Sequence, residues 1–209
     1  MTEPRAGPRV ERLIVAITGA SGAIYGVRIL ERLREVAVET HLILSRWAKV
    51  TIEHETGYDV SRVKQLADVN YSEGEQAAAI SSGSFLTLGM VIAPCSAKTL
   101  AAIAIGFSDN LICRAADVSL KERRRLVLVV REAPLSTIHL RNMLTVSELG
   151  ATVFPPCPSF YGRPKDIDGL VDYTVMRILD QFSINLDLGG RWEGLGGAPP
   201  ISSARRDDE

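Results

Sequence analysis

Residues 13–23 read LIVAITGASGA, an unbroken apolar run that ends in a glycine-rich turn. Ile24, Val27, Leu30 and Leu33 follow it at helical spacing. A short apolar run closed by glycine is typical of a buried strand, and the periodic segment behind it is typical of a helix. The segment therefore predicts a strand, a tight loop and a helix in that order.

The same alternation recurs along the rest of the chain. Apolar runs predict strands at 40–44, 90–93, 126–130 and 151–154, and periodic segments predict helices at 46–55, from 96, at 110–121 behind an Asp109 cap, at 136–149 and at 166–182. Strands that are apolar on both faces and alternate with helices predict an α/β fold with a doubly wound parallel sheet. We expect one domain over residues 12–192, between flexible segments at 1–11 and 193–209.

Composition excludes several classes of partner. The chain has 24 basic and 25 acidic residues, so its net charge of −1 gives no field that would attract nucleic acid or a membrane surface. The first eleven residues lack the apolar core of a secretory signal, which favours a cytoplasmic protein. Three widely spaced cysteines indicate reduced thiols, and three histidines without ligand spacing indicate no metal site.

Polar loops follow several of the predicted strands. Because ligands bind beyond the carboxyl ends of parallel strands, the loops opened by Gly19, Ser45, Pro94 and Arg131 should face one crevice. The GASG turn at a helix start predicts free amides that hold a phosphate or a flavin edge, although nicotinamide-binding folds open similarly and a packing turn would look the same. The loop PCSAKT at 94–99 also places hydroxyls at a helix start, where they either bind phosphate or only cap the helix.

Six motifs occur in one order over nearly the whole chain. They are TGASGA at 18–23, SSGSF at 81–85, PCSAKTLA at 94–101, RAADVSLKERR at 114–124, REAPLSTIHL at 131–140 and PSFYGRP at 158–164. This set closely resembles the UbiX-type flavin prenyltransferases, including those encoded beside phenolic-acid decarboxylases.

The resemblance implies a flavodoxin-like Rossmann fold, FMN bound at a subunit interface, and a homo-oligomer that is usually a dodecamer. It also implies metal-independent transfer of a dimethylallyl group from dimethylallyl phosphate to N5 of reduced FMN, with ring closure at C6. The prenylated FMN would then serve a UbiD-type decarboxylase as partner.

The motifs carry the family's site residues onto this chain. The FMN site is expected to use Gly19, Ala20, Ser21, Ser45, Ser96, Ala97, Lys98, Thr99 and Arg131. The prenyl phosphate site is expected to use Arg114, Lys121, Glu132, Tyr161 and Arg177. Catalytic proton handling is expected from Ser21, Glu55 and Glu132. Three cations gathered around one departing phosphate would stabilise its developing charge.

Single residues have simpler interpretations. The basic run at 121–125 alone indicates a solvated helix end, Tyr161 alone indicates packing, and Trp192 either reaches a neighbouring active site or packs at a core or interface. The chain also departs from the family pattern, with Val130 for a common proline, Arg141 for glutamate, and Glu75-Gln76 for an aspartate and an apolar residue.

Two other functions remain open from the sequence. One is a flavin-dependent cysteine decarboxylase, which would call for a PASANT-type loop and an active-site histidine after the first helix. Here the loop is PCSAKT and the first helix has no histidine. The other is a non-catalytic flavin carrier or assembly subunit of an aromatic-acid decarboxylase, which would not need the prenyl phosphate residues.

Overall fold

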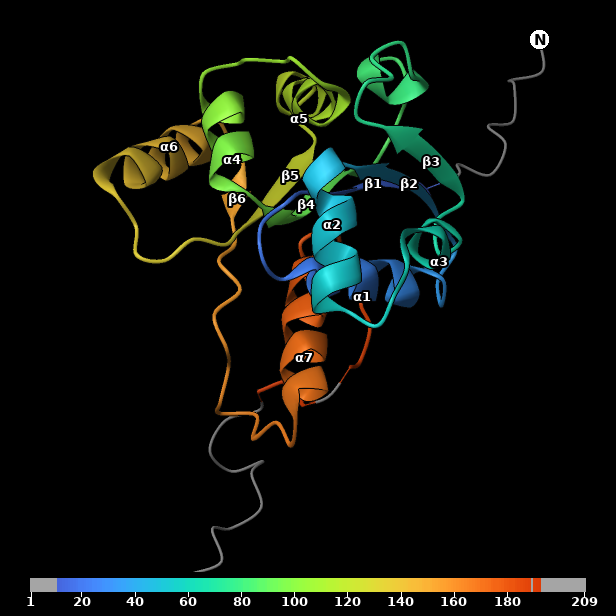
Figure 1. The fold of residues 1–209 in the computed structure, drawn as a ribbon, viewed down its shortest axis with the longest axis vertical. Helices are drawn as coiled ribbons and strands as arrows, with labels where there is room; N and C mark the ends of the chain where they lie inside the picture. The colour runs from blue at the N-terminus through green and yellow to red at the C-terminus, as the bar shows by residue number, and fades with distance from the viewer. Residues whose placement is uncertain (1–10, 189, 193–209) are drawn as a thin grey trace, which may run out of the picture.

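The core of the protein is one six-stranded parallel sheet (Figure 1). The computed structural model describes residues 11–188 and 190–192, so residues 1–10 and 193–209, which the sequence predicts to be flexible, lie outside it. The strands are β1 (Glu11–Ile17), β2 (Val38–Leu44), β3 (Val69–Ser72), β4 (Gly89–Cys95), β5 (Arg125–Val130) and β6 (Thr152–Val153). Their order is β3-β2-β1-β4-β5-β6, so the strand order reverses between β1 and β4. This confirms the doubly wound α/β fold, and it puts a ligand-binding switch point at the β1–β4 boundary.

Helices cover both faces of the sheet. One face carries α1 (Ala23–Leu33), α2 (Arg46–Glu55), α3 (Val60–Lys64) and α7 (Ile167–Asp180), and the other carries α4 (Ala97–Ala104), α5 (Leu111–Lys121) and α6 (Thr137–Glu148) (Figure 1). Strand β1 serves both layers, because Leu13 and Val15 face the first core and Ile14 faces the second. Fully burying such side chains contributes about 1.5–3 kcal/mol each.

Most helices begin where a polar side chain caps them. Ser45, Ser96, Ser136 and Asp166 each accept a hydrogen bond from the backbone amide three residues on, at the four helix starts that the sequence predicts near them. The Asp109 cap is a wrong prediction. Asn110 has the extended backbone that an N-cap needs, and its side chain accepts from the amide of Cys113 at 3.0 Å.

The sequence analysis missed α3, β3 and a short 3-10 turn at Ala79–Ser81. Strand β3 is a four-residue edge strand with alternating exposed positions, so it lacks the apolar run that marked the other strands. Strand β1 begins at Glu11, one residue before the predicted start of the domain. Every helix within the described residues is too short or too polar to cross a membrane.

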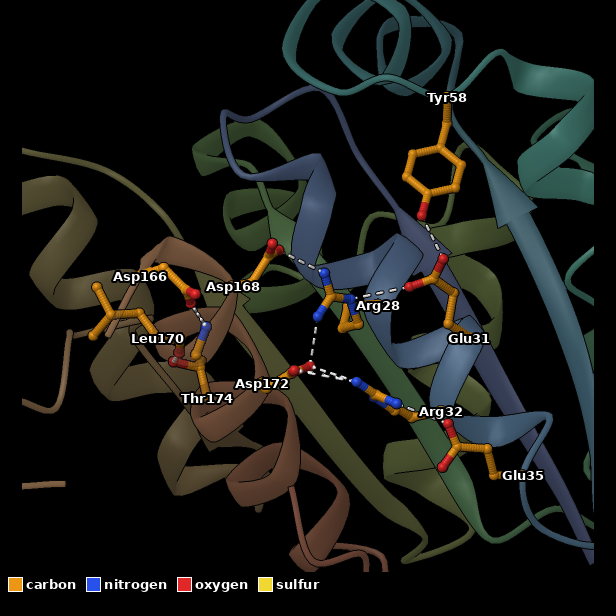
Figure 2. Close-up of polar contacts among 11 residues, drawn as sticks. Arg28, Glu31, Arg32, Glu35, Tyr58, Asp166, Asp168, Leu170, Asp172 and Thr174 are labelled. Atoms are coloured by element: carbon orange, nitrogen blue, oxygen red, sulfur yellow. Dashed lines mark hydrogen bonds and ion pairs between the residues drawn. The ribbon is translucent and has the colours of Figure 1, made fainter. Parts of the chain in front are cut away.

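An ion-pair network fixes α7 against α1 (Figure 2). Arg28 of α1 pairs with both Asp168 and Asp172 of α7 at 2.7 Å, and Arg32 pairs with Asp172 at 3.1 Å. The Arg28 side chain is only 13% exposed, so these pairs are less screened than surface pairs. The network therefore holds α7, and the side chains that α7 carries toward the sheet edge, in a fixed place.

Candidate active site

A cavity of about 540 Å³ opens at the switch point of the sheet. Its lining includes five residues of the predicted FMN site, from the loops after β1, β2 and β4: Gly19, Ser45, Ser96, Lys98 and Thr99. The prediction that these loops face one crevice is thus confirmed for three of the four loops. A volume of several hundred Å³ is the size of a small-molecule or cofactor site.

The start of α4 gathers several groups of the kind that bind anions in proteins. The hydroxyl of Thr18 donates to the Pro94 carbonyl at 2.7 Å and accepts from the Ser96 amide at 2.9 Å, which ties the β1 loop to the β4 loop. The first amides of a helix lack intrahelical acceptors and carry the positive end of its dipole. Lys98 adds a charge that is 69% exposed, although Asp109 lies 3.6 Å from it. Ala97 is the first residue of α4, so its amide belongs to this anion-binding turn.

The glycine-rich loop, which includes Ala20 and Ser21, lies directly beside α2. A side chain at Gly19 would place its Cβ 2.3 Å from the Cβ of Trp47, so the close approach requires glycine. The carboxylate of Glu55, at the end of α2, accepts from the amides of Gly22 at 2.8 Å and Ala23 at 3.2 Å. These two amides are therefore not free for a ligand phosphate, contrary to the prediction for this turn, and Glu55 instead anchors the loop that carries Ser21.

A second cavity of about 370 Å³ brings Tyr161 and Arg177 together. Arg177 Nη1 lies 3.6 Å from Asp180 Oδ2, and the Arg177 side chain is half exposed. This ion pair is therefore weak, and the guanidinium can bind a ligand. Trp192 also lines the cavity, with its ring centroid 5.5 Å from that of Tyr161. Tyr173 is a further lining residue that sequence reasoning missed. Its only sequence signal is its position one helical turn before Arg177.

The predicted cluster of three cations does not form within one chain. Arg114 and Lys121 lie on α5, and Arg177 lies on α7, on the opposite face of the sheet (Figure 1). Arg114 donates to the Ser81 carbonyl at 3.2 Å and pairs with Asp117 at 2.8 Å, while Lys121 pairs with its neighbour Glu122. The chain passes to the other face of the sheet between α6 and α7, a change that the linear motif order could not show.

Arg131 and Glu132 follow β5 at the same edge of the sheet. The Arg131 amide donates to the Cys95 carbonyl at 3.3 Å, which places this loop next to the α4 loop. Glu132 Oε1 accepts from the Ala133 amide at 3.2 Å. Neither Arg131 nor Glu132 is among the described residues that line the two cavities. The fourth predicted loop therefore borders the crevice but does not face it in a single chain.

The cysteines offer no nucleophile at this edge. Burial raises the pKa of the Cys113 thiol to about 11 and that of Cys95 further still, so both remain protonated near neutral pH. Cys157 is exposed beside the second cavity. The part of the chain that the structure describes contains no cluster of three or more His, Cys, Asp or Glu side chains that could hold a metal.

Comparisons with known proteins agree with this architecture. Residues 2–179 match the Flavoprotein family. A probable UbiX-like flavin prenyltransferase of Bacillus subtilis (strain 168) is 55% identical over 191 residues, which cover 91% of this chain and 94% of that protein.

Two crystal structures also match over most of the chain. That of AnUbiX (PadA1) in complex with FMN and dimethylallyl pyrophosphate matches with a TM-score of 0.88 and 54% identity, over 89% of this chain and 99% of that one. That of a dodecameric FMN-dependent UbiX-like decarboxylase from Escherichia coli O157:H7 matches with a TM-score of 0.86 and 54% identity, over 88% and 100%. The chain therefore belongs to the flavoprotein family, within its UbiX-like flavin prenyltransferases.

Proposed function

We propose that this protein is a flavin prenyltransferase, which transfers a dimethylallyl group from dimethylallyl phosphate to N5 and C6 of reduced FMN. The observation that carries the proposal is the pair of cavities: one at an anion-binding helix start, and one with Arg177 and Tyr161 suited to a second phosphate. The AnUbiX structure, which holds both FMN and a prenyl donor, supports two such ligands in one fold.

The first cavity fits FMN. Its phosphate would lie at the start of α4, with the hydroxyls of Ser96 and Thr99, the Lys98 charge and the first-turn amides as partners. The flat ring system would then extend toward Gly19 and Ser45, which line the same cavity. Bound reduced FMN supplies the nucleophilic N5.

The second cavity would drive departure of the donor's phosphate. When the allylic C–O bond breaks, its electron pair leaves with the phosphate, so positive charge and hydrogen-bond donors at the departing oxygens lower the barrier. Arg177 and Tyr161 supply these groups from this chain. We assign Glu132 to hold a proton for the leaving phosphate. We assign Ser21 to accept the N5 proton together with Glu55, whose carboxylate accepts from the Gly22 amide next to Ser21.

We further propose that a second copy completes the site with Arg114 and Lys121. Two copies are needed because α5 and α7 lie on opposite faces of the sheet in one chain. The dodecameric relative supports an assembly of this kind. Exposed apolar side chains on α6, among them Ile138 at 66% and Leu144 at 60%, favour association as well. The product would pass to a UbiD-type decarboxylase in the cytoplasm.

Anaerobic incubation of the purified protein with reduced FMN and dimethylallyl phosphate tests the reaction. Mass spectrometry of the released flavin should show FMN heavier by one five-carbon unit. Bound but unmodified FMN with either the monophosphate or the diphosphate donor would contradict the transferase and favour the carrier function. Oxidative decarboxylation of a cysteine-ended peptide would instead support a cysteine decarboxylase.

Mixing two inactive variants tests whether the site is shared between copies. Arg114→Ala and Arg177→Ala should each lose prenylation. Co-expressed in equal amounts, they should recover about a quarter of wild-type activity, because each site draws each arginine from one of two equally frequent chains. Absence of recovery in an assembly shown by native mass spectrometry to contain both variants would mean that the two arginines do not meet between copies.

A further inference from the structure

One side chain of α7 holds Tyr161 in the second cavity. The hydroxyl of Tyr173 is hydrogen-bonded to the hydroxyl of Tyr161. The two rings meet edge to face, with centroids 5.7 Å apart and planes at 89°. Within the described residues, the Tyr161 hydroxyl makes no other hydrogen bond. Tyr161 lies on a Pro-rich loop and is 52% exposed, so the contact with Tyr173 is the main one that fixes the position of its hydroxyl.

Tyr173 is itself held rigidly. It precedes Arg177 by one helical turn, so both side chains project from one face of α7 into the same cavity. The residue directly before it, Asp172, pairs with Arg28 and Arg32 of α1 (Figure 2). The Tyr173 hydroxyl is thus placed by the packed helix pair α1–α7, whereas Tyr161 depends on a loop.

The two hydroxyls form a donor chain that ends in the cavity. A tyrosine hydroxyl has one proton to donate and can accept as well. Burial, and then the bond with Tyr161, raises the pKa of Tyr173, so it keeps its proton near neutral pH and can donate it to the Tyr161 oxygen. The proton of Tyr161 is then free for an acceptor in the cavity, and successive hydrogen bonds polarise one another.

We infer that Tyr173 is a positioning residue for the prenyl donor: it orients the Tyr161 hydroxyl so that this group and Arg177 bind the same phosphate. The inference rests on the proposed function, because it takes the second cavity to be the donor phosphate site. The hydrogen bond to Tyr173 holds the Tyr161 hydroxyl before the donor binds, which reduces the ordering cost that binding would otherwise carry.

The Tyr173→Phe variant isolates the hydrogen bond, because it keeps the ring contact and removes only the hydroxyl. KM for dimethylallyl phosphate should rise roughly three- to tenfold, the range of one neutral hydrogen bond. Because Tyr173 acts only through the Tyr161 hydroxyl, kcat should fall no further than it does in Tyr161→Phe, and the dissociation constant for FMN should not change. The double variant Tyr161→Phe/Tyr173→Phe should have the KM of Tyr161→Phe alone, because the group through which Tyr173 acts is already absent.

Tyr58→Phe is the matched control. Its hydroxyl is likewise bonded across two elements, to the carboxylate of Glu31, and it lies away from the second cavity, so KM should stay at the wild-type value (Figure 2). An unchanged KM in Tyr173→Phe, or fully additive effects in the double variant, would overturn the inference.

Failure of the proposed function would be visible separately. If the wild-type protein makes no prenylated FMN, calorimetry of dimethylallyl phosphate binding to the FMN-loaded protein still tests Tyr173. A weaker dissociation constant in Tyr173→Phe, with wild-type affinity in Tyr58→Phe, supports the positioning role. Equal affinities in all three proteins refute it.

Discussion

Replacing Arg177 with alanine should lower kcat/KM for dimethylallyl phosphate by about 10²–10³-fold, the typical loss when one preorganised donor to a developing anion is removed. The guanidinium is the one cation that the described part of α7 places in the second cavity beside Tyr161. Its pair with Asp180 at 3.6 Å is long and half exposed, so the folded state does not depend on it. Steady-state rates with reduced FMN, measured together with thermal unfolding, check both points.

Arg34→Ala is the control for loss of an arginine as such. Arg34 follows α1, its guanidinium donates to the Gln65 carbonyl at 2.8 Å, and neither residue lines either cavity. Its rate should match that of the wild-type protein. A wild-type kcat/KM in Arg177→Ala would contradict the assignment of the second cavity to the donor phosphate. Other residues would then bind that phosphate.

Strands and helix starts were predictable because their signals are local. The run LIVAIT and the apolar runs of β2, β4 and β5 are buried on both faces, and serines at 45, 96 and 136 cap helices through bonds that reach only three residues. The helix cap was assigned to Asp109 in place of its neighbour Asn110 because aspartate and asparagine are equally good N-cap residues. Strand β3 was missed because an exposed edge strand needs no apolar face.

Part of the candidate site was predictable for a related reason. Loops that follow parallel strands meet at one edge, so Gly19, Ser45 and Ser96 could be placed together from strand positions alone. Contacts that depend on the direction of a side chain could not be predicted in this way. Glu55 reaches the amide of Gly22 across 33 residues, and the Tyr161–Tyr173 bond joins a loop to a helix. The prediction of a three-cation cluster was wrong for a single chain because the chain connections decide which face of the sheet each helix covers. The order of motifs in the sequence does not contain that information.

Gly26 should be the least replaceable residue of α1. A Cβ at this position would lie 2.3 Å from the carbonyl oxygen of Ala93 and 2.7 Å from the Ile17 side chain, so helix and sheet must separate. Gly26→Ala gains about 1 kcal/mol of helix propensity. Overpacking against a backbone atom costs about 3 kcal/mol or somewhat more, so the free energy of unfolding should fall by about 2 kcal/mol. Urea unfolding at matched protein concentration measures this change.

The displacement should also reach the cofactor site. Ala93 directly precedes the Pro94 carbonyl that Thr18 holds at 2.7 Å, and that bond joins the two loops of the first cavity. Gly26→Ala should therefore weaken FMN binding as well as stability, by fluorescence titration of the flavin. Gly57→Ala is the matched control, since a Cβ there would meet nothing within 4 Å. Unchanged stability and FMN affinity in Gly26→Ala would mean that α1 can shift on the sheet without moving the loops, and that the close contact at Gly26 does not set their position.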